Sequence, residues 1–460
     1  MKKILCILMA ATMLLTACRQ EEETTAPEKE IPVEKAEATV KEEVFIEEMD
    51  MELHKAEGFP LTREELPWTV DTSSADYLLE LCAPKYEGRS AGSAGNRAAA
   101  DWIEEQFVEM GLQQYPAFSS YHQSFSSDVF EMLPGYAAII SADGTETELE
   151  LGTEWTYTPS YEEIDLTLPL SENMEDCEAG KAFLDATATK QNSPWRVISV
   201  VCSDLTTNTG HFSRDGYNNA SRIKVLPEMY EKLKEEGTKL HVKLPLAAKK
   251  GKADNVIAYL PGENSERAVL LCAHFDGSGE SGRLMPSAYD NASGAATLLQ
   301  TASWLSKADS LPCDVIIAAL NSEEIGLVGS EAFSTQIKNR YQQILTVNID
   351  CMGWKEEPHV IYAENSQSVL RNNLAAALDL QYIGVDYASD HMSFRESNMK
   401  SVMISQQANF SGGAADRIAH SYRDTVDNLD TDSMDELAKQ LSIWVLERGD
   451  MAVSSYVLYW

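Results

Sequence analysis

The spacing of hydrophobic and polar positions changes along the chain and is most regular after residue 255. There, short apolar runs alternate with longer segments in which apolar residues recur at helical spacing. Strand–helix alternation of this kind is typical of a mostly parallel sheet flanked by covering helices, so we predict an α/β fold. The predicted strands are 255–260, 268–273, 314–320, 345–350 and 401–405, and the predicted helices are 293–307, 329–338, 366–378 and 434–447.

The region before residue 255 has a different pattern. Residues 73–115 predict a helix, a loop of small residues at 88–96 and a second helix at 97–110 that ends before Gly111. Residues 126–250 then mix strand-like and helix-like runs, which indicates an inserted α/β domain of their own. Within it we expect strands at 136–140, 197–202 and 239–244 and a helix at 227–236. We therefore assign 67–125 and 251–460 to one domain and 126–250 to the insert.

The N-terminus has the pattern of an export signal. Lys2 and Lys3 precede an apolar run from residue 4 to 15 that is too short to span a bilayer. The sequence Leu-Thr-Ala-Cys that follows resembles the bacterial lipobox, in which cleavage leaves an acylated N-terminal cysteine. This resemblance implies a signal peptide at 1–17, a lipid anchor at Cys18 and a place outside the cytoplasm in the bacterial cell envelope. A plain signal peptide with an incidental Cys18 is the alternative.

Residues 18–66 are rich in Glu, Lys, Thr, Ala and Pro. Such a composition buries too little apolar surface to offset chain entropy, so we predict a disordered acidic tether, with a short acidic helix within 44–57 left open. The whole chain of 460 residues has 73 acidic and 37 basic residues, a formal charge of −36. Nucleic acid and anionic membrane surfaces need a positive footprint, so we exclude them as main partners and expect membrane contact through the lipid anchor alone.

The cysteines show no paired spacing that would suggest a cysteine zinc site. Cys202 and Cys272 lie inside apolar runs, and we predict that both are buried free thiols. Disulfides elsewhere remain open.

Histidine and carboxylate residues follow the predicted strands. His274 ends one strand, Glu323 and Glu324 follow the next, and Asp350 ends a third. Asp290 precedes a helix, and His420 would arrive from a loop. Singly, each has another interpretation: Asp290 as a helix cap, His274 as a core histidine, the two glutamates as a solvated pair. Together they indicate a cation, because carboxylates gathered at buried strand ends repel unless a cation neutralises them.

The motifs around these residues resemble the zinc aminopeptidase family that also contains glutamate carboxypeptidases, glutaminyl cyclases and transferrin receptors. The resemblance runs through AHFDGSGE, AYDNASGAATLLQ, NSEEIGLVGSEAF, NIDCMGW, SDHMSF and AHSYRDT, in the family's order, and the segment at 88–112 resembles the family's opening segment. It implies two Zn²⁺ ions per chain bridged by Asp290. His274 and Asp350 would complete one site, and Glu324 and His420 the other.

The resemblance also implies the roles of neighbouring residues. Glu323 would be the general base that takes a proton from a water shared by the two metals. Asp276 would accept a hydrogen bond from the second ring nitrogen of His274. Asp390 and His391 match a motif near the pocket, with capping or a surface position as the alternative. Several family members have Tyr before the last histidine, where this chain has Ala419, so Tyr422, another group or the metals alone would stabilise the tetrahedral intermediate.

These observations predict an extracytoplasmic di-zinc metallopeptidase that acts on peptides. An aminopeptidase is the leading interpretation. A carboxypeptidase or a glutaminyl-cyclase-like enzyme of the same family is the alternative, because these activities share their metal ligands. A binding protein that kept the fold without catalysis is a third. The insert at 126–250 resembles, on fewer residues, the protease-associated domain, which would shape substrate access.

Overall fold

The structure is a computed structural model and describes residues 52–452, apart from 59, 131–132, 158–162, 170–182, 185–197, 203–220, 356, 386, 407–414 and 416–417. The predicted signal peptide, Cys18 and most of the predicted tether therefore lie outside the described residues. Within the described part of the chain, no helix is long and apolar enough to cross a membrane.

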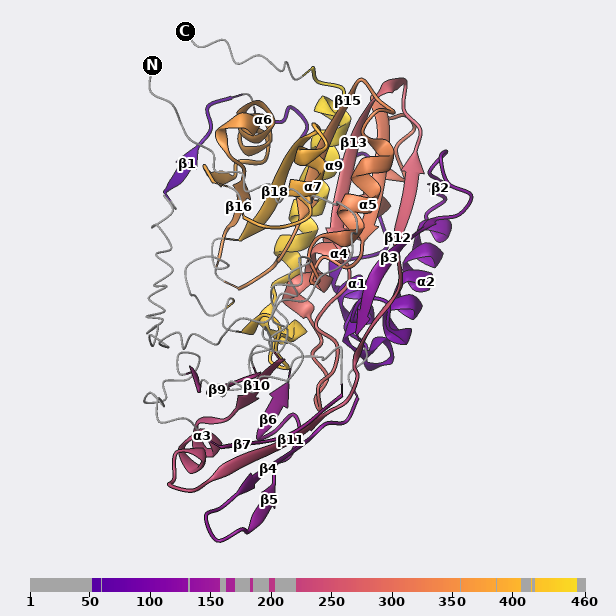
Figure 1. Cartoon of the computed structure of the whole chain (residues 1–460). Coiled ribbons are helices and arrows are strands. Elements are labelled where there is room, and N and C mark those ends of the chain that lie inside the picture. The colour runs from indigo at the N-terminus through magenta and orange to yellow at the C-terminus, as the bar shows by residue number, and fades with distance from the viewer. Residues whose placement is uncertain are drawn as a thin grey trace, which may run out of the picture. The chain divides into compact units, whose positions relative to one another are not determined.

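The central element is a ten-stranded mixed sheet in the order β1-β17-β16-β18-β15-β13-β14-β12-β2, with β3 also paired to β12 (Figure 1). Its centre is parallel: β13 pairs with β14 and β15, and β15 pairs with β18. Strands β12 and β16, which flank this centre, are antiparallel to it. The strands are β1 (Leu53–Lys55), β2 (Gln113–Gln114), β3 (His122–Phe130), β12 (Ala248–Leu260), β13 (Asn264–His274), β14 (Cys313–Leu320), β15 (Gln343–Ile349), β16 (His359–Tyr362), β17 (Gln381–Ile383) and β18 (Lys400–Gln406).

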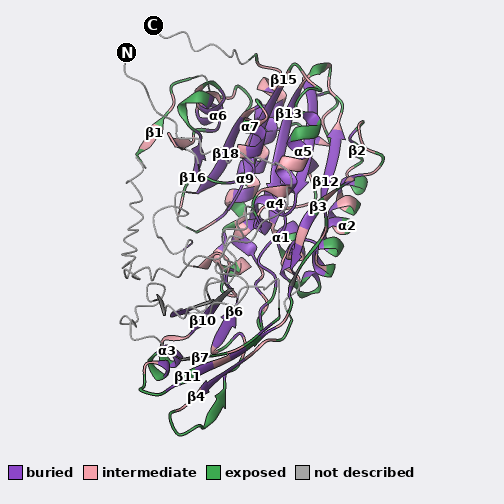
Figure 2. Ribbon diagram, viewed as in Figure 1, coloured by how far each residue is buried: buried purple, intermediate pink, exposed green. Residues whose placement is uncertain are grey.

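Helices cover both faces of this sheet, and the alternation of side chains along each strand explains how. In β13, Val269 and Leu271 share a core with helices α1, α2, α4 and α9, whereas Leu270 packs on the other face with Phe333 of α5 and Phe394 of α7. Both faces are therefore apolar, and the central strands are buried (Figure 2). The helices are α1 (Ser74–Leu81), α2 (Ala94–Glu109), α4 (Ser293–Leu305), α5 (Val328–Ile337), α6 (Ser368–Leu378), α7 (His391–Glu396) and α9 (Thr431–Arg448). The predicted α/β fold class is confirmed.

Two element boundaries differ from the sequence prediction for identifiable reasons. Helix α9 begins three residues earlier than predicted because the Asp430 side chain accepts hydrogen bonds from the backbone N–H groups of Asp432 and Ser433 and caps it there. Strand β12 begins at Ala248 rather than residue 255 because it pairs with β3 along its whole first half. This β3–β12 ribbon joins the central sheet to the segment between the two strands.

That segment, within the predicted insert, forms two four-stranded sheets, β6-β10-β9-β8 and β5-β4-β11-β7. They enclose a core separate from the central one, built around Trp155, Tyr157 and Tyr230. Cys202 is disulfide-bonded, so the prediction of a free thiol there is wrong, whereas Cys272 is free and buried as predicted. The elements are β4 (Tyr136–Ile140), β5 (Glu146–Glu148), β6 (Trp155–Tyr157), β7 (Ile164–Pro169), β8 (Phe183–Leu184), β9 (Ile198–Cys202), β10 (Ser221–Val225), α3 (Pro227–Leu233) and β11 (Lys239–Leu244).

The end of the predicted tether is ordered. Residues 53–55 form β1, which pairs antiparallel with β17 at the edge of the central sheet, so no helix forms at that point. Further along, Thr62 and Arg63 donate backbone hydrogen bonds to the Glu447 carboxylate of α9. The chain therefore joins the folded domain earlier than the predicted boundary at residue 66, because an open sheet edge and a helix side chain supply hydrogen-bond partners that composition does not reveal.

Candidate metal centre

The five predicted ligands meet at the carboxyl edge of the parallel strands. His274 is the last residue of β13, Asp350 follows β15, and Glu324 lies four residues after the end of β14. Asp290 lies in the turn Ala288–Ala292, directly before α4. His420 arrives on the turn after residue 418. A parallel sheet brings successive strand ends to one edge, which explains how residues far apart in sequence converge.

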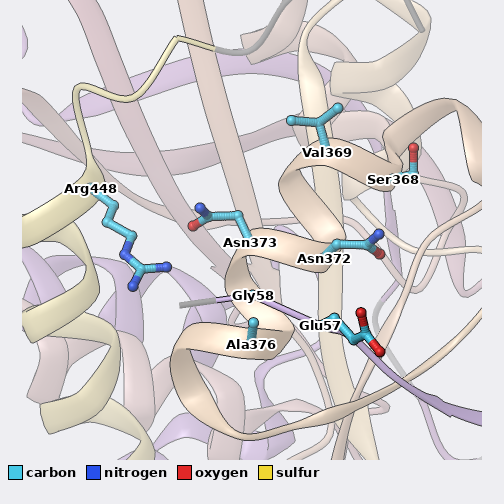
Figure 3. Close-up of a pocket in the computed structure, with 8 residues that line it drawn as sticks. All are labelled: Glu57, Gly58, Ser368, Val369, Asn372, Asn373, Ala376 and Arg448. Carbon is cyan, nitrogen blue, oxygen red and sulfur yellow. The ribbon is translucent and has the colours of Figure 1, made fainter. Parts of the chain in front are cut away.

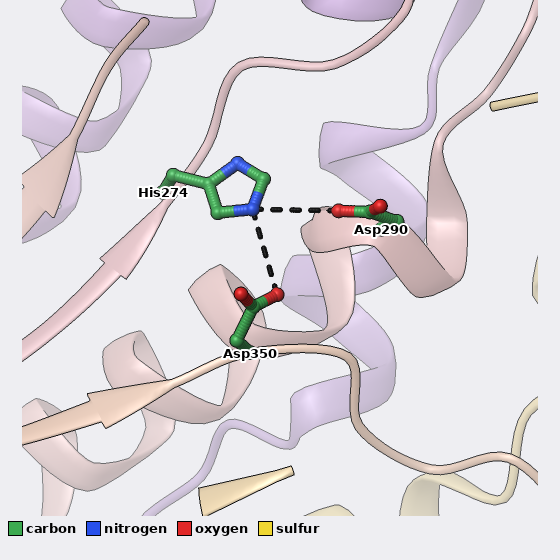
Figure 4. A group of neighbouring side chains, drawn as sticks. All are labelled: His274, Asp290 and Asp350. Atoms are coloured by element: carbon green, nitrogen blue, oxygen red, sulfur yellow. Dashed lines mark ion pairs between the residues drawn. The ribbon is translucent and has the colours of Figure 1, made fainter. Parts of the chain in front are cut away.

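The ligand atoms form two groups that share Asp290. His274 Nε2 lies 3.4 Å from Asp290 Oδ1 and 3.5 Å from Asp350 Oδ1, as Figure 4 shows. His420 Nε2 lies 2.8 Å from Asp290 Oδ2 and 3.1 Å from Glu324 Oε2. The two oxygens of Asp290 thus face different histidines, which is the geometry that a bridging carboxylate needs.

Several polar atoms of this cluster lack, within the described part of the chain, the hydrogen-bond partners that buried polar atoms normally have. His274 Nε2, Asp350 Oδ1 and Glu324 Oε1 are buried and have no hydrogen-bond partner among the described residues. Buried polar atoms are normally hydrogen-bonded, and several in one cluster call for an explanation. Imidazole nitrogen and carboxylate oxygen are ligands that suit Zn²⁺. The cluster therefore has the donor set and the unsatisfied atoms of a metal centre.

The charges at the centre also favour a cation. Burial alone would lower the pKa of His274, but Glu323, Asp276 and other carboxylates raise it well above its usual value. His420 behaves in the same way, with burial opposed by Glu324 and Asp290. Burial raises the pKa of the Glu323 carboxyl well above its usual range. The two histidine shifts reflect excess negative charge at the site, which a metal cation would relieve.

Side chains next to the ligands join the elements that carry them. Asn291 donates to the carbonyl of Ile349 at 3.1 Å and accepts from the backbone N–H of Cys351 at 3.0 Å, so it holds both neighbours of Asp350. Asp424, from the His420 loop, accepts from the backbone N–H groups of Tyr289 at 2.7 Å and Asp290 at 3.1 Å. These buried bonds fix the spacing of three ligand-bearing segments.

Asp276 occupies a position between two ligands. Nδ1 of His274 lies 3.3 Å from the backbone oxygen of Asp276 and 3.6 Å from its carboxylate Oδ1. The carboxylate itself accepts hydrogen bonds from the backbone N–H groups of Glu323 and Glu324, both at 3.2 Å. Asp276 therefore connects the loop after β13 to the loop after β14, and it sets the direction in which the two glutamates leave the backbone.

Arg89 is a residue that the sequence pattern did not single out. Its guanidinium is fully buried and donates to four backbone carbonyls: Leu81 at 2.6 Å, Phe275 at 2.7 Å, Ser287 at 2.8 Å and Pro286 at 3.0 Å. Phe275 follows His274, and Ser287 precedes the turn that contains Asp290. Arg89 thus ties together two ligand-bearing segments. The sequence signal that could have found it is an arginine within a loop of glycines and serines. Small neighbours offer few side-chain acceptors for a guanidinium, so its donors need several acceptors elsewhere.

The remaining predicted pocket residues lie close to the ligands. Asp390 and His391 are fully buried at the start of α7, where burial raises the pKa of Asp390 to about 7 and lowers that of His391 to about 4. Their neighbour Ser389 donates to Asp350 Oδ2 at 2.5 Å. Tyr422 is partly exposed and packs under Arg283, and Ala419 lies in the turn that presents His420.

An open depression elsewhere contains none of the predicted site residues. It is lined by Glu57, Gly58, Ser368, Val369, Asn372, Asn373, Ala376 and Arg448, at the junction of the N-terminal segment with α6 and α9 (Figure 3). It offers neither a histidine nor a cluster of carboxylates, so the chemistry belongs to the edge of the sheet.

Comparison with known proteins finds one matching family and several solved structures with a similar fold. Residues 255–445 match peptidase family M28. No curated protein matched the chain by sequence. Among solved structures, an aminopeptidase from Aneurinibacillus sp. strain AM-1 is 19% identical, with a TM-score of 0.56, and covers 83% of this chain and 95% of its own.

Two further solved structures have the same fold. BSAP, a zinc aminopeptidase from Bacillus subtilis, is 15% identical with a TM-score of 0.57, covering 83% of this chain and 96% of its own. A peptidase M28 precursor from Shewanella amazonensis is 15% identical with a TM-score of 0.58, covering 83% and 93%. Residues 255–445, which match peptidase family M28, contain every predicted ligand, and together with the shared fold this match supports a metallopeptidase of the hydrolase class.

Proposed function

We propose that this protein is a di-zinc aminopeptidase that removes N-terminal residues from peptides. The observation that carries the proposal is the division of the ligands into two groups that share Asp290, with one oxygen toward His274 and the other toward His420. Asp350 would complete the first site and Glu324 the second. The buried, unpartnered atoms of His274, Asp350 and Glu324 support metal at both sites.

The metals and the residues around them would have separate roles in hydrolysis. Two zinc ions would lower the pKa of an attacking water and stabilise the charge that develops on the substrate carbonyl oxygen. Glu323 would take the proton from that water and pass it to the leaving amine, as a general base does. Asp276 would keep Glu323 in place through the backbone hydrogen bond described above.

Two substitutions test the metal and the base separately. Glu323→Gln should reduce kcat by at least about 100-fold while the protein still binds about two zinc ions, because it removes a proton acceptor and no ligand. Asp290→Ala should instead lose zinc, measured by elemental analysis. Full activity of Glu323→Gln would refute the assignment of the base, and two zinc ions retained by Asp290→Ala would refute the bridge.

The activity itself needs a substrate comparison. Peptides with a free N-terminus, peptides with a blocked N-terminus and a peptide with N-terminal glutamine distinguish an aminopeptidase from a carboxypeptidase and from a glutaminyl cyclase. We expect cleavage of the first group only, and its loss on zinc chelation. Cleavage of N-blocked peptides from the carboxyl end, or cyclisation of the glutamine peptide, would replace the proposal with one of the alternatives.

We further propose export and anchoring through Cys18, supported by the lipobox-like sequence that precedes it. The wild-type protein should partition with the membrane fraction, and Cys18→Ser should release it to the soluble extracytoplasmic fraction. Equal partitioning of the wild type and Cys18→Ser would contradict the lipid anchor.

We also propose that the sheets between β3 and β12 act as a protease-associated-like domain that shapes substrate access.

A further inference from the structure

The loop between His274 and Asp290 carries an arginine that the proposed reaction does not use. Arg283 is exposed, and its guanidinium carbon lies 4.3 Å from the centre of the Tyr422 ring. No ion pair or side-chain hydrogen bond joins Arg283 to any residue that the structure describes. An arginine stacked by its flat face keeps its in-plane N–H donors available, and these donors match a carboxylate in a bidentate geometry.

Both members of the pair are close in sequence to the more exposed residues of the metal centre. The side chains of His274 and Glu324 are 1% and 4% exposed and form the floor, whereas those of Asp290 and His420 are 16% and 17% exposed and face solvent. Tyr422 follows His420 by two residues, so their Cα atoms lie within about 8 Å. Arg283 itself lies seven residues before Asp290, so each member of the pair is close in sequence to a proposed ligand.

The loop that carries Arg283 is held on both sides. The backbone N–H of Gly279 donates to the Gly88 carbonyl at 3.0 Å. On the other side, the hydroxyl of Ser281 is hydrogen-bonded to that of Thr156 in β6, and Gly282 packs directly on the backbone of Gly152. Gly282 has a φ of +69°, and a Cβ there would lie 2.5 Å from the Leu151 carbonyl oxygen, so only glycine fits this contact. A fixed loop and a stacked ring leave Arg283 little freedom to lose on binding.

Resting on the proposed aminopeptidase function, we propose that Arg283, stacked on Tyr422, binds a carboxylate of the peptide substrate and makes short or acidic peptides the preferred substrates. The carboxylate is either the C-terminus of a short peptide or an acidic side chain just beyond the scissile bond. Both sources present the same planar anion, and the same two N–H donors would receive it.

The test compares matched peptides on the zinc-loaded full-length enzyme. One pair has the same sequence with a free or an amidated C-terminus, and the other has Glu or Gln after the first residue, both amidated. In the wild type, the charged member of at least one pair should have the higher kcat/KM. Arg283→Gln should reduce that preference by about 10- to 100-fold, mostly through KM, because it removes one charge-assisted interaction.

Two control variants and one further test variant separate this role from general effects. Arg423→Gln removes an equal charge from the residue that follows Tyr422, and it should keep the wild-type preference. Tyr422→Phe keeps the stacking ring and should keep the preference, whereas Tyr422→Leu should weaken it. Zinc content should equal that of the wild type in each variant, since none of these residues is a proposed ligand.

The outcomes distinguish this inference from the function on which it rests. A lost preference confined to the first pair assigns Arg283 to the C-terminal carboxylate, and one confined to the second assigns it to an acidic side chain. An unchanged preference in Arg283→Gln for both pairs overturns the inference, even if hydrolysis of the amidated peptides continues. Absence of hydrolysis of all four peptides by the zinc-loaded wild type would instead overturn the proposed function.

Discussion

Replacing Arg89 with methionine should destabilise the protein and weaken its metal centre together. The substitution keeps most of the apolar stem and removes all the donors that reach the four carbonyls of Leu81, Phe275, Pro286 and Ser287. Each hydrogen bond from a charged donor contributes about 1.5–3 kcal/mol, so four would exceed about 6 kcal/mol. Burying the guanidinium costs several kcal/mol, and this cost disappears with the side chain. The net loss should be about 3 kcal/mol.

Urea unfolding followed by tryptophan fluorescence measures this loss as a lower transition midpoint. Zinc affinity should fall in the same variant, because two of the freed carbonyls flank the segments of His274 and Asp290. Arg97→Met is the matched control: Arg97 is exposed and, among the residues that the structure describes, donates to the Gly92 carbonyl alone, so its loss should cost less than about 1 kcal/mol. Arg89→Lys should recover part of the loss, because one ammonium reaches fewer of the carbonyls. A loss below about 1 kcal/mol in Arg89→Met, with zinc affinity unchanged, would refute the reasoning.

Three further predictions follow from described contacts. Chelating zinc should lower the melting temperature by several degrees and zinc alone should restore it, because ligands that bind only the folded state stabilise it; an unchanged melting temperature would argue against bound metal. Gly294→Ala should cost about 1–3 kcal/mol and reduce zinc content, since a Cβ there would lie 2.3 Å from Asn291 Oδ1; a fully stable variant would contradict this. His241, hydrogen-bonded to Glu146 at 2.9 Å and Asp165 at 3.0 Å, has a pKa raised above 6.5 chiefly by Glu146, so its contribution to stability is present below pH 6.5 and lost as pH rises through the raised value. NMR titration should show a lower pKa in Glu146→Gln, and an equal pKa in both proteins would disprove the coupling.

The sequence by itself determined the class of fold and the identity of the residues that meet at the sheet edge. Apolar runs that alternate with helical spacing locate strands such as β14 within a residue or two, because the strands are buried on both faces and the helices on one. The ends of parallel strands meet at one edge of a sheet, so the positions of His274, Glu324 and Asp350 after predicted strands place them there. The family motifs, rather than periodicity, single these residues out as ligands.

Tertiary structure decided what depends on contacts between distant segments. The pairing of β1 with β17, the start of β12 at Ala248 and the disulfide bond of Cys202 all depend on partners that local periodicity does not specify. The four carbonyls around Arg89 come from three separate segments, and neither their number nor their direction can be read from a loop of small residues. The stacking of Arg283 on Tyr422 likewise joins residues more than a hundred positions apart. Composition and spacing specify which groups are available, whereas the packed backbone alone sets the distances at which they act.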